Sequence, residues 1–401
     1  MATYLSAGEA ASELGINLPT LYAYVSRGMI RSESEGRSRR RRYLAEDIWL
    51  LKQRKQHRRD PARAAEEALH WGMPVLESRL SVIRDGRLFY RGRDAVALAQ
   101  SSTIEQVAAL LWSGDLNAVF PDEVLMPSNW KTLTEMTRPL PPLEGFQALL
   151  PMAAVQDPYA YDIRQAAVQR AGARILRLLA AAAVGGRPAH DPVAQVLQRR
   201  WAPREPDVAS LLQAALVLYA DNGLNPSSFT ARCVASAGST PYAVVTAGLA
   251  ALQGTKHGGA CERAAGLLEE AREAHGAQRV VLARLRRGEA VPGFGHPLYP
   301  EGDPRGALLM RLVAEHRPKS PDVKLALALQ EAVRDLMNDH PTVDFGVVTL
   351  CRALRLPPGA PLALLGVGRV VGWIAHGLEQ YQEGREIRPR ARYAGEPPQE
   401  L

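Results

Sequence analysis

The sequence predicts a mainly α-helical protein in which a small N-terminal unit precedes a large helical part. Aromatic residues make up only 6% of the 401 residues, whereas hydrophobic residues make up 46% and Ala and Leu are abundant. Ala and Leu are strong helix formers, and β-rich cores depend on aromatic and β-branched side chains, so this composition favours helices. A chain of this length exceeds one compact core, and we expect two or three folding units.

The N-terminal residues predict two short helices followed by a strand pair. Ser6 with Glu9 three residues later is a capping-box signature for a first helix, which Gly15 ends. Asn17 can cap a second helix over LPTLYAYVSR, and the two helices form a helix-turn-helix unit. The basic segment MIRSESEGRSRRRRYL then indicates a β-hairpin.

This N-terminal pattern resembles the winged helix-turn-helix domains of the mercury-resistance-regulator (MerR-like) and excisionase type. The resemblance covers residues 4–58 and is carried by Glu9-Ala10-Ala11, Gly15-Ile16, Thr20-Leu21-Tyr22, Gly28 and Arg42-Tyr43. It implies a domain over residues 1–70 and double-stranded DNA as a partner. The implied DNA contacts are Thr20, Tyr22, Ala23 and Arg27 on the second helix and Arg37, Arg39, Arg40, Arg41 and Arg42 on the wing. The alternative is a solvated basic loop on a domain that does not bind DNA.

Charge and cysteine usage restrict the class of protein further. The net charge is +7, which suits anionic partners without distinguishing nucleic acid, nucleotide cofactors and polycarboxylates. Three widely separated cysteines lack metal-ligand spacing and indicate buried thiols in a reducing compartment, with no metal. The N-terminus lacks a secretory signal, and the apolar helix over 175–186 is too short to cross a membrane. We therefore expect a cytoplasmic protein with no membrane partner.

The rest of the chain predicts one strand pair and then a succession of helices. Asp85-Gly86 is a hairpin signal inside VIRDGRLFYRGRDAVALAQ, which leads into a helix. Apolar residues at three- and four-residue intervals, with glycines at the ends, then predict helices. These lie over 102–114, 162–186, 207–223, 240–254, 261–276, 322–340, 346–356 and 360–384. No glycine-rich phosphate loop or dinucleotide fingerprint occurs.

Three loops between these helices carry polar residues that packing alone does not explain. They are GTKHGGACE with His257, VPGFGHPLYPEGDPRG with His296 and HPTVDFG with Asp344. Glycines let the backbone approach a ligand closely, and a helix start offers unpaired N–H groups to an anion. Taken singly, each histidine reads as an ordinary loop residue and Asp344 as a helix N-cap. Their combination indicates a functional site.

The three blocks, in this order, resemble the active-site blocks of citrate synthases. Further matches are LNPSSFTARCVASAGSTPY at 224–242, GRVVGWIAHGLEQ at 368–380 and REIRPRARYAG at 385–395, so the resemblance spans about residues 75–395. It implies a mainly α fold whose large domain comprises residues 71–225 and 344–401. The implied small domain, residues 226–343, would close over the ligand.

The resemblance also implies the reaction. Citrate synthases condense acetyl-CoA with oxaloacetate through an enol(ate), giving citrate and CoA without a permanently bound cofactor or a metal. The weakly acidic thioester α-proton needs a positioned base and a group that holds the developing oxyanion. By resemblance Asp344 is the base, His257 donates a hydrogen bond to the enol oxygen, and His296 polarises and protonates the oxaloacetate ketone.

The same resemblance assigns the residues that bind substrate. Arg305, Arg369 and Arg388 would neutralise the dicarboxylate, since planar guanidinium groups match carboxylates in two-point fashion. In the family the last of these arginines comes from the neighbouring subunit, which implies a homodimer. Taken without the blocks, these three would read as a salt bridge, a solvated helix residue and a tail charge. Val291, Pro292, Gly293 and Thr342 would line the CoA slot, and Asn222 would contact oxaloacetate.

Departures from the family pattern leave alternatives open. Asn222 stands where the family usually has histidine, Thr342 where asparagine is common, and Cys261 where HGGANE has asparagine. One rival is a 2-methylcitrate synthase using propionyl-CoA, because one methylene shifts preference by only ~1–3 kcal/mol. Another is a DNA-binding regulator whose second part senses citrate or an acyl-CoA. In a third, residues 1–70 only stabilise the dimer or cover the active site.

Overall fold

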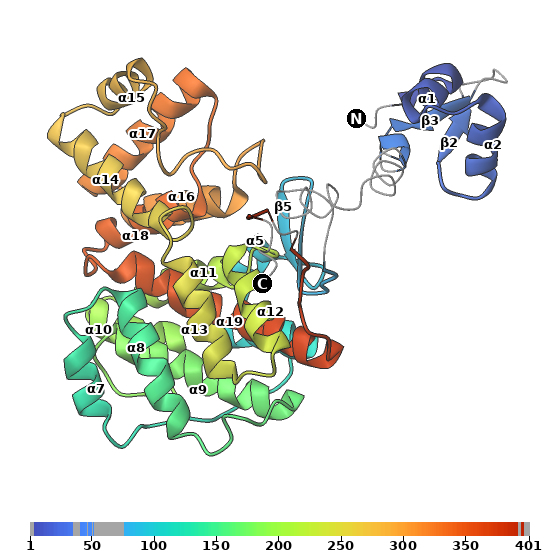
Figure 1. Ribbon diagram of the computed structural model, residues 1–401. Helices are drawn as coiled ribbons and strands as arrows, with labels where there is room; N and C mark the ends of the chain where they lie inside the picture. The colour runs from blue at the N-terminus through green and yellow to red at the C-terminus, as the bar shows by residue number, and fades with distance from the viewer. Residues whose placement is uncertain are drawn as a thin grey trace. The chain divides into compact units, whose positions relative to one another are not determined.

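The computed structural model describes residues 4–34, 41–45, 47–49, 51, 76–391 and 394–396. The chain divides into two compact units, residues 1–77 and residues 78–401 (Figure 1). The second unit is almost wholly helical, which confirms the predicted fold class of that part.

Among its described residues, the first unit combines helices with a small antiparallel sheet. The elements with defined bounds there are β1 (Tyr4–Leu5), α1 (Ala7–Leu14), α2 (Leu18–Ser26), β2 (Ser32–Ser34) and β3 (Arg41–Leu44), and the strand order is β1-β3-β2. The predicted capping box is confirmed: the Ser6 hydroxyl accepts from Glu9 N at 3.3 Å, and the Glu9 carboxylate accepts from Ser6 N at 2.8 Å. Gly15 ends α1 in the left-handed conformation, and the Asn17 side chain caps α2.

The second unit begins with the predicted hairpin. It contains β4 (Ser81–Arg84), β5 (Arg87–Tyr90) and β6 (Arg93–Asp94), paired antiparallel in that order. Asp85 and Gly86 have φ values of 51° and 67°, the conformation that a two-residue hairpin turn requires. The Tyr90 hydroxyl donates to the Val217 carbonyl oxygen at 3.0 Å, which fastens the sheet to the helical core.

The helices follow the sheet. They are α5 (Ala95–Ser101), α6 (Ile104–Ser113), α7 (Trp130–Thr137), α8 (Pro142–Val155), α9 (Gln165–Ala183), α10 (Val193–Trp201), α11 (Val208–Tyr219), α12 (Pro226–Ser236), α13 (Pro241–Leu252), α14 (Gly259–Glu273), α15 (Ala277–Arg286), α16 (Pro304–His316), α17 (Pro321–Met337), α18 (Val343–Ala353) and α19 (Ala360–Glu383). Each helix predicted from periodicity is present. The structure adds α7, α8, α10, α12, α15 and α16.

Proline explains half of these additional helices. Pro142, Pro226 and Pro304 each occupy the first position of their helix. At that position the missing N–H would have no intrahelical partner, and the fixed φ already suits a helix. A proline inside an apolar segment therefore marked the start of a helix rather than a break.

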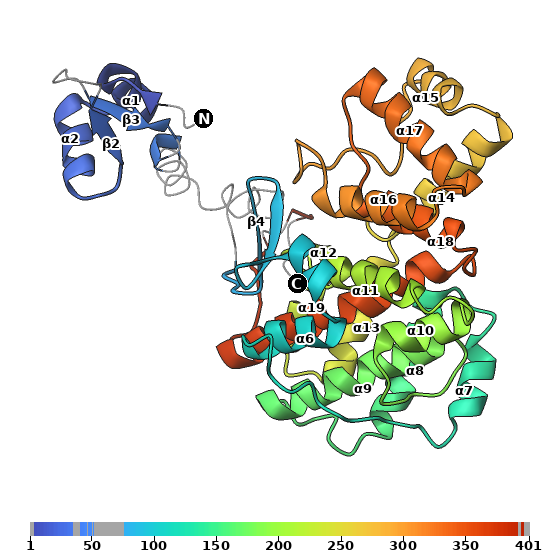
Figure 2. The ribbon, with the colours of Figure 1, turned by 180° about the vertical axis from the view of Figure 1, so that it is seen from behind.

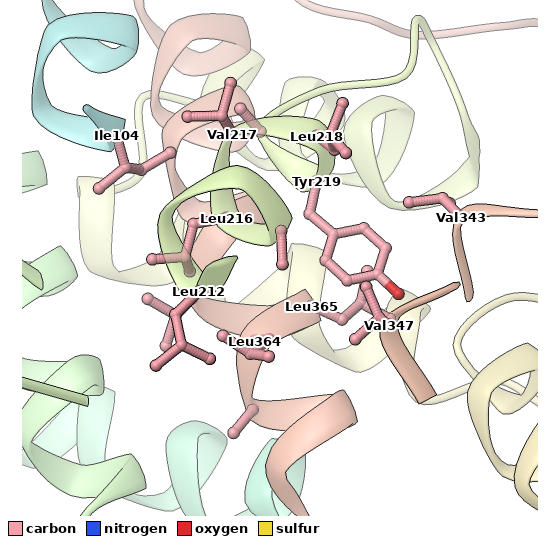
Figure 3. Packing of buried hydrophobic residues seen from close by; sticks show 14 of the residues in the cluster. Ile104, Leu212, Leu216, Val217, Leu218, Tyr219, Val343, Val347, Leu364 and Leu365 are labelled. Carbon is pink, nitrogen blue, oxygen red and sulfur yellow. The ribbon is translucent and has the colours of Figure 1, made fainter. Parts of the chain in front are cut away.

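Helix α19 is the centre of the second unit. It is long and apolar enough to cross a membrane, with a hydropathy of 1.3, but 94% of that window is buried inside the protein. Helices α6, α8, α9, α11, α12 and α13 pack around it. Figure 3 shows Leu364 and Leu365 of this helix in the same buried cluster as Leu212 and Leu216 of α11. Its apolar character is accounted for by the core it forms.

Helices α14, α15, α16, α17 and α18 form a second group. Helices α14, α15 and α17 pack on one another, and α16 packs on α18 (Figures 1 and 2). Helices α11 and α18 connect the groups, because α11 contacts both α16 and α18, and α18 contacts α19. The end of α11 and the starts of α14, α16 and α18 therefore lie where the two groups meet.

Candidate functional site

The loop of residues 291–306 is joined to the loop of residues 340–344 by backbone hydrogen bonds. Thr342 N donates to the Gly293 carbonyl oxygen at 2.9 Å, and Gly295 N donates to the His340 carbonyl oxygen at 3.0 Å. The Asp303 carboxylate accepts from Val343 N at 3.0 Å. These bonds hold the loop that carries His296 against the helix start that carries Asp344.

Two glycines make this close approach possible. Gly293 and Gly295 have φ values of 86° and 70°, which side chains rarely adopt. A Cβ on Gly293 would lie 3.0 Å from the Phe345 ring, and one on Gly295 would lie 2.9 Å from an Asp339 carboxylate oxygen. The glycine-rich sequence of this loop is therefore a packing requirement of the site.

His296 is held as a neutral imidazole with a defined tautomer. Leu298 N donates to its Nδ1 at 3.1 Å, so the ring proton is on Nε2. Burial lowers the pKa of His296, and the positive charge of Arg305 lowers it further. A neutral imidazole with an Nε2 proton can donate a hydrogen bond to a ketone oxygen.

His257 is also neutral. Burial lowers its pKa to about 4, with a further contribution from the charge of Arg369. Its Nε2 lies 2.9 Å from the Ser227 hydroxyl, which also accepts a hydrogen bond from Trp373 Nε1 at 3.2 Å. A Cβ on the following Gly258 would lie 2.2 Å from the Leu252 carbonyl oxygen, so the backbone turn at His257 requires glycine.

Asp344 is the second residue of α18, whose N-cap is Thr342. Its Oδ1 atom accepts from the Tyr219 hydroxyl at 2.9 Å and from the Cys261 thiol at 3.2 Å. The sequence did not single out Tyr219, and it favoured a small buried thiol for Cys261, which is indeed buried. The adjacent Asp-Asn motif in ADNG was the one available signal that the end of α11 approaches the site.

Arg305 is fully engaged by protein groups. Its Nε and Nη2 donate to the two Asp303 carboxylate oxygens, each at 2.9 Å, and its Nη1 donates to Asn222 Oδ1 at 3.1 Å. The Tyr299 hydroxyl donates to the same Asn222 oxygen at 2.9 Å. Arg305 is 2% exposed, so this is a buried network rather than a surface salt bridge.

Arg369 lies in the middle of α19 with a different environment. It is 4% exposed, and its Nε and Nη1 have no hydrogen-bond partner among the described residues. Burial lowers its pKa, and the charge of Asp221 offsets only part of this effect. The Asp221 carboxylate already accepts from Ser81 and lies 3.3 Å from His376 Nε2. A buried cation with open donors is suited to an anionic ligand.

Electrostatic interactions link the three proposed catalytic groups. The charge of Asp344 acts on the pKa of His296, and that of Arg369 acts on the pKa of His257. Arg369 also interacts with Asp344 and with Arg305. The structure thus brings the two histidines, the aspartate and two of the three arginines into one cluster.

Arg388 lies apart from this cluster. It is exposed in the segment after α19, and no hydrogen bond or ion pair among the described residues joins it to the other site residues. The Ser236 hydroxyl accepts from Ile387 N at 3.1 Å, and Gln380 Nε2 donates to the Arg385 carbonyl oxygen at 2.8 Å. The segment is therefore anchored to the end of α12 and to the end of α19.

The proposed CoA-contacting residues lie within the two loops of residues 291–306 and 340–344. Val291 is 4% exposed, Pro292 is half-buried, and the Gly293 carbonyl oxygen accepts from both the backbone and the hydroxyl of Thr342. Within the described part of the chain, no three His, Cys, Asp or Glu side chains are grouped so as to hold a metal ion.

The first unit carries the other predicted contacts. Thr20, Tyr22 and Ala23 lie on α2 and Arg27 is its C-cap; Tyr22 is 51% exposed, and the Thr20 hydroxyl donates to Asn17 Oδ1. Arg41 and Arg42 are exposed on β3, and Arg41 donates to the Ser32 hydroxyl at 3.4 Å. Arg37, Arg39 and Arg40 lie outside the described residues.

Comparison with known proteins gives a consistent result. Residues 68–390 match the sequence model of the family described as citrate synthase, C-terminal domain. The chain is 31% identical over 359 residues to a citrate synthase of Haloferax volcanii, covering 81% of this chain and 94% of that protein. It is 28% identical to citrate synthase 2 of Bacillus subtilis, with the same coverage of both chains.

Solved structures agree. The citrate synthase of Thermotoga maritima superposes with a TM-score of 0.70 at 28% identity, covering 82% of this chain and 96% of that one. The enzyme of Pyrobaculum aerophilum superposes with a TM-score of 0.71 at 26% identity, covering 82% and 92%. The fold is also shared with the citrate synthase of Thermoplasma acidophilum, solved as a ternary complex with carboxymethyl coenzyme A and oxaloacetate, at a TM-score of 0.68.

Proposed function

The chain belongs to the citrate synthase family and is an enzyme of that class, and on this premise we propose that His257, His296 and Asp344 are its catalytic residues. The substrates are an acyl-CoA, in the simplest case acetyl-CoA, and oxaloacetate. The observations that support the assignment are the hydrogen bonds that join the loop of His296 to the helix start of Asp344, the Cys261–Asp344 hydrogen bond beside His257, and Arg369, a buried cation with open donors. The products are citrate and free CoA.

Asp344 starts the reaction by taking a proton from the methyl carbon of the thioester. The electron pair of the broken C–H bond moves to the thioester oxygen, which becomes an enol(ate) oxygen. His257 donates a hydrogen bond to that oxygen when the Ser227 hydroxyl donates to its Nε2 and the ring proton is on Nδ1. Because both imidazoles are neutral, neither protonates the Asp344 carboxylate, which must act as the base.

His296 completes carbon–carbon bond formation. The enol carbon attacks the ketone carbon of oxaloacetate, and the Nε2 proton of His296 moves to the ketone oxygen. Water then hydrolyses the citryl thioester and releases CoA as a free thiol. Arg369 and Arg305 hold the dicarboxylate, Asn222 supports Arg305, and Val291, Pro292, Gly293 and Thr342 line the slot for the coenzyme.

The test is release of free thiol from acetyl-CoA in the presence of oxaloacetate. We expect Asp344→Asn to lose at least ~10³-fold in kcat while it retains wild-type affinity for oxaloacetate. Asp335→Asn is the matched control, since Asp335 is an exposed aspartate that pairs with Arg334, outside the site. Turnover by Asp344→Asn at the wild-type rate would contradict the assignment.

Arg388 completes the site from a neighbouring subunit, which makes the enzyme a homodimer with shared sites. The support is its exposure and its separation from the cluster within one chain. Arg388→Ala and Asp344→Asn dimers should each be inactive, and mixing them with subunit exchange should restore activity, because one site of each hybrid has both groups. Failure of the mixture to recover activity would contradict shared sites.

The domain division follows the same premise. The small domain of residues 226–343 moves against the large domain of residues 71–225 and 344–401 to close the site. Within that span α12 and α13 pack on α19, and α13 also packs on α8, so the residues after Gly254 are the part of the small domain that we expect to move most. The cytoplasm is the compartment that we propose.

The first unit is a winged helix-turn-helix domain that binds double-stranded DNA. The helix pair α1–α2 and the β2–β3 hairpin support this proposal, with Tyr22, Arg27 and Arg41 exposed for contact. Fluorescence anisotropy with duplex DNA should detect binding that weakens as salt rises, because phosphate contacts release counterions. Arg27→Ala with Arg41→Ala should weaken it, and absence of binding at low salt would exclude DNA as the partner.

A further inference from the structure

Two buried side chains contact the same oxygen of the proposed base. Tyr219 is the last residue of α11, and Cys261 is the third residue of α14. The Tyr219 hydroxyl lies 2.9 Å and the Cys261 sulfur 3.2 Å from Asp344 Oδ1, and the two donors are 3.5 Å from each other. Figure 3 shows the Tyr219 ring reaching from α11 toward Val343 and Val347 of α18. Two helices thus fix the carboxylate of a third.

Both groups keep their protons and therefore act as donors. Burial raises the pKa of the Tyr219 hydroxyl well above its usual value, and the charge of Asp344 raises it further. Burial and the same charge raise the pKa of the Cys261 thiol. Tyr219 is 1% exposed and Cys261 is 2% exposed, so water does not compete for Asp344 Oδ1.

We propose that Tyr219 and Cys261 are positioning residues for the base: they occupy Oδ1 of Asp344 and so direct Oδ2 at the substrate α-carbon. This inference rests on the proposed catalytic role of Asp344. No hydrogen bond to Oδ2 occurs among the described residues, so Oδ2 is the atom that accepts the proton when the C–H bond breaks. Both donors remain in place when the carboxylate becomes a neutral acid.

The physical effect has two parts. A hydrogen bond donated to a carboxylate stabilises its charged form, which offsets the cost of burying the charge beside apolar residues. Two donors from different helices also stop rotation of the carboxylate, and a base that is correctly aimed gains rate through orientation. The other charged or titratable groups that act on Asp344 are Arg369 of α19 and His296 of the catalytic loop.

The first test replaces Tyr219 by phenylalanine, which removes only the hydroxyl. We expect kcat to fall about tenfold, because the carboxylate is no longer held in its reactive orientation, with KM for oxaloacetate unchanged. The acidic limb of the pH–rate profile should move to higher pH, because the ionised carboxylate has lost a donor. The isotope effect on kcat with deuterated acetyl-CoA should increase as proton abstraction becomes slower than the other steps.

Tyr242→Phe is the matched control. Tyr242 is equally buried, and its hydroxyl donates to the Asp157 carboxylate at 2.8 Å in a different part of the core. It loses the same kind of hydrogen bond, so any effect of destabilisation alone appears in both variants. We expect its pH–rate profile and isotope effect to equal those of the wild-type enzyme.

The second test replaces Cys261, so that the inference does not depend on one variant folding. Cys261→Ala should lower kcat a few-fold, and Cys261→Ser should lose less because it keeps a donor. Cys351→Ala, at a buried thiol of α18 without a hydrogen bond to Asp344, is the control. The double variant Tyr219→Phe/Cys261→Ala should lose more than either single variant.

The outcomes separate this inference from the proposed function. Suppose that Asp344→Asn is inactive, but Tyr219→Phe and Cys261→Ala have the wild-type pH profile and isotope effect. That result would overturn the positioning role and leave Asp344 assigned as the base. An active Asp344→Asn would overturn both. Equal pH shifts in Tyr219→Phe and Tyr242→Phe would also overturn the positioning role, since the effect would then be general.

Discussion

Arg305 at the start of α16 and Arg369 in the middle of α19 are buried to nearly the same extent but differ in what surrounds them. Arg305 has a bidentate partner in Asp303 and a third acceptor in Asn222. Arg369 has two nitrogen atoms without partners among the described residues. Burial acts to lower the pKa of both, yet the charge of Asp303 raises the pKa of Arg305, whereas that of Arg369 stays lowered.

This difference indicates that Arg305 stabilises the fold, whereas Arg369 has donors open to a ligand. The Asp303 carboxylate also accepts from Val343 N, so the Arg305 pair fastens α16 to the start of α18 and hence to Asp344. Arg369 contributes no such link, and its uncompensated charge is a cost to the unliganded protein. We infer that Arg369 lowers the stability of the unliganded protein but increases its affinity for an anion. Arg305 both stabilises the fold and binds the anion.

The largest expected effect is on substrate use by Arg369→Met. We expect kcat/KM for oxaloacetate to fall about 10³- to 10⁴-fold, since truncating one partner of a buried charge pair costs ~4–5 kcal/mol. The melting temperature without ligand should be equal to or above that of the wild-type enzyme, because an unpaired buried charge is removed. Steady-state kinetics and thermal unfolding check this pair of results.

Arg311→Met is the control for that variant, because Arg311 is a half-exposed arginine on α16. It should change neither kinetics nor melting temperature measurably. A wild-type KM for oxaloacetate in Arg369→Met would mean that the open donors do not bind the substrate.

The second largest effect that we expect is a loss of stability in Arg305→Met. This change leaves the Asp303 carboxylate buried without its cation, and we expect the free energy of unfolding to fall by ~3 kcal/mol. Urea unfolding measures the change. Adding Asp303→Asn to the same chain should recover part of the loss, and a double variant no more stable than Arg305→Met would contradict the pairing.

The pH dependence of stability gives a smaller effect. The folded pKa of His257 is about 4, below its unfolded value of ~6.5. Between these values the unfolded chain binds a proton that the folded chain does not, so lowering the pH favours unfolding. Stability is fully present above pH ~6.5 and should fall by ~3 kcal/mol as the pH approaches 4.

Arg369→Met sharpens this prediction, because the charge of Arg369 is one cause of the lowered pKa of His257. The loss of stability between pH ~6.5 and 4 should be smaller in that variant. Chemical unfolding at several pH values measures it, and an equal loss in both proteins would mean that burial alone keeps His257 neutral.

The smallest expected effect is in Asn222→Ala. Arg305 Nη1 and the Tyr299 hydroxyl both lose their acceptor on Asn222, so the guanidinium is held less firmly. We expect KM for oxaloacetate to rise about fivefold, which corresponds to ~1 kcal/mol for a neutral hydrogen bond. Substrate titration measures the change, and an unchanged KM would place Asn222 outside the binding of oxaloacetate.

Much of the fold could be predicted from local sequence. Period and composition predicted the long helices, and Ser6 with Glu9, Gly15 and Asp85-Gly86 predicted a capping box, a helix end and a hairpin turn that the structure confirms. These features depend on contacts within a few residues of one another. The sequence analysis did not predict α8, although Pro142 occupies the first helical position, where proline suits a helix.

The candidate site was predictable only as separate blocks. The sequence marked His257, His296 and Asp344 by the loops that carry them, and their resemblance to one family placed them in one reaction. It did not mark Tyr219, because a tyrosine at the end of an apolar helix has the same sequence pattern as any core residue. Its role depends on the angle at which α11 meets α18, which local periodicity does not specify.

Local sequence was enough to specify the helical fold class, the glycine-rich loops around His257 and His296, and the family. The tertiary structure alone decided which of two buried arginines is neutralised, which oxygen of Asp344 is occupied, and which tautomer His296 adopts. The reason is physical: helix formation depends on neighbours along the chain, whereas charge balance and proton position depend on groups that only folding brings within a few ångströms.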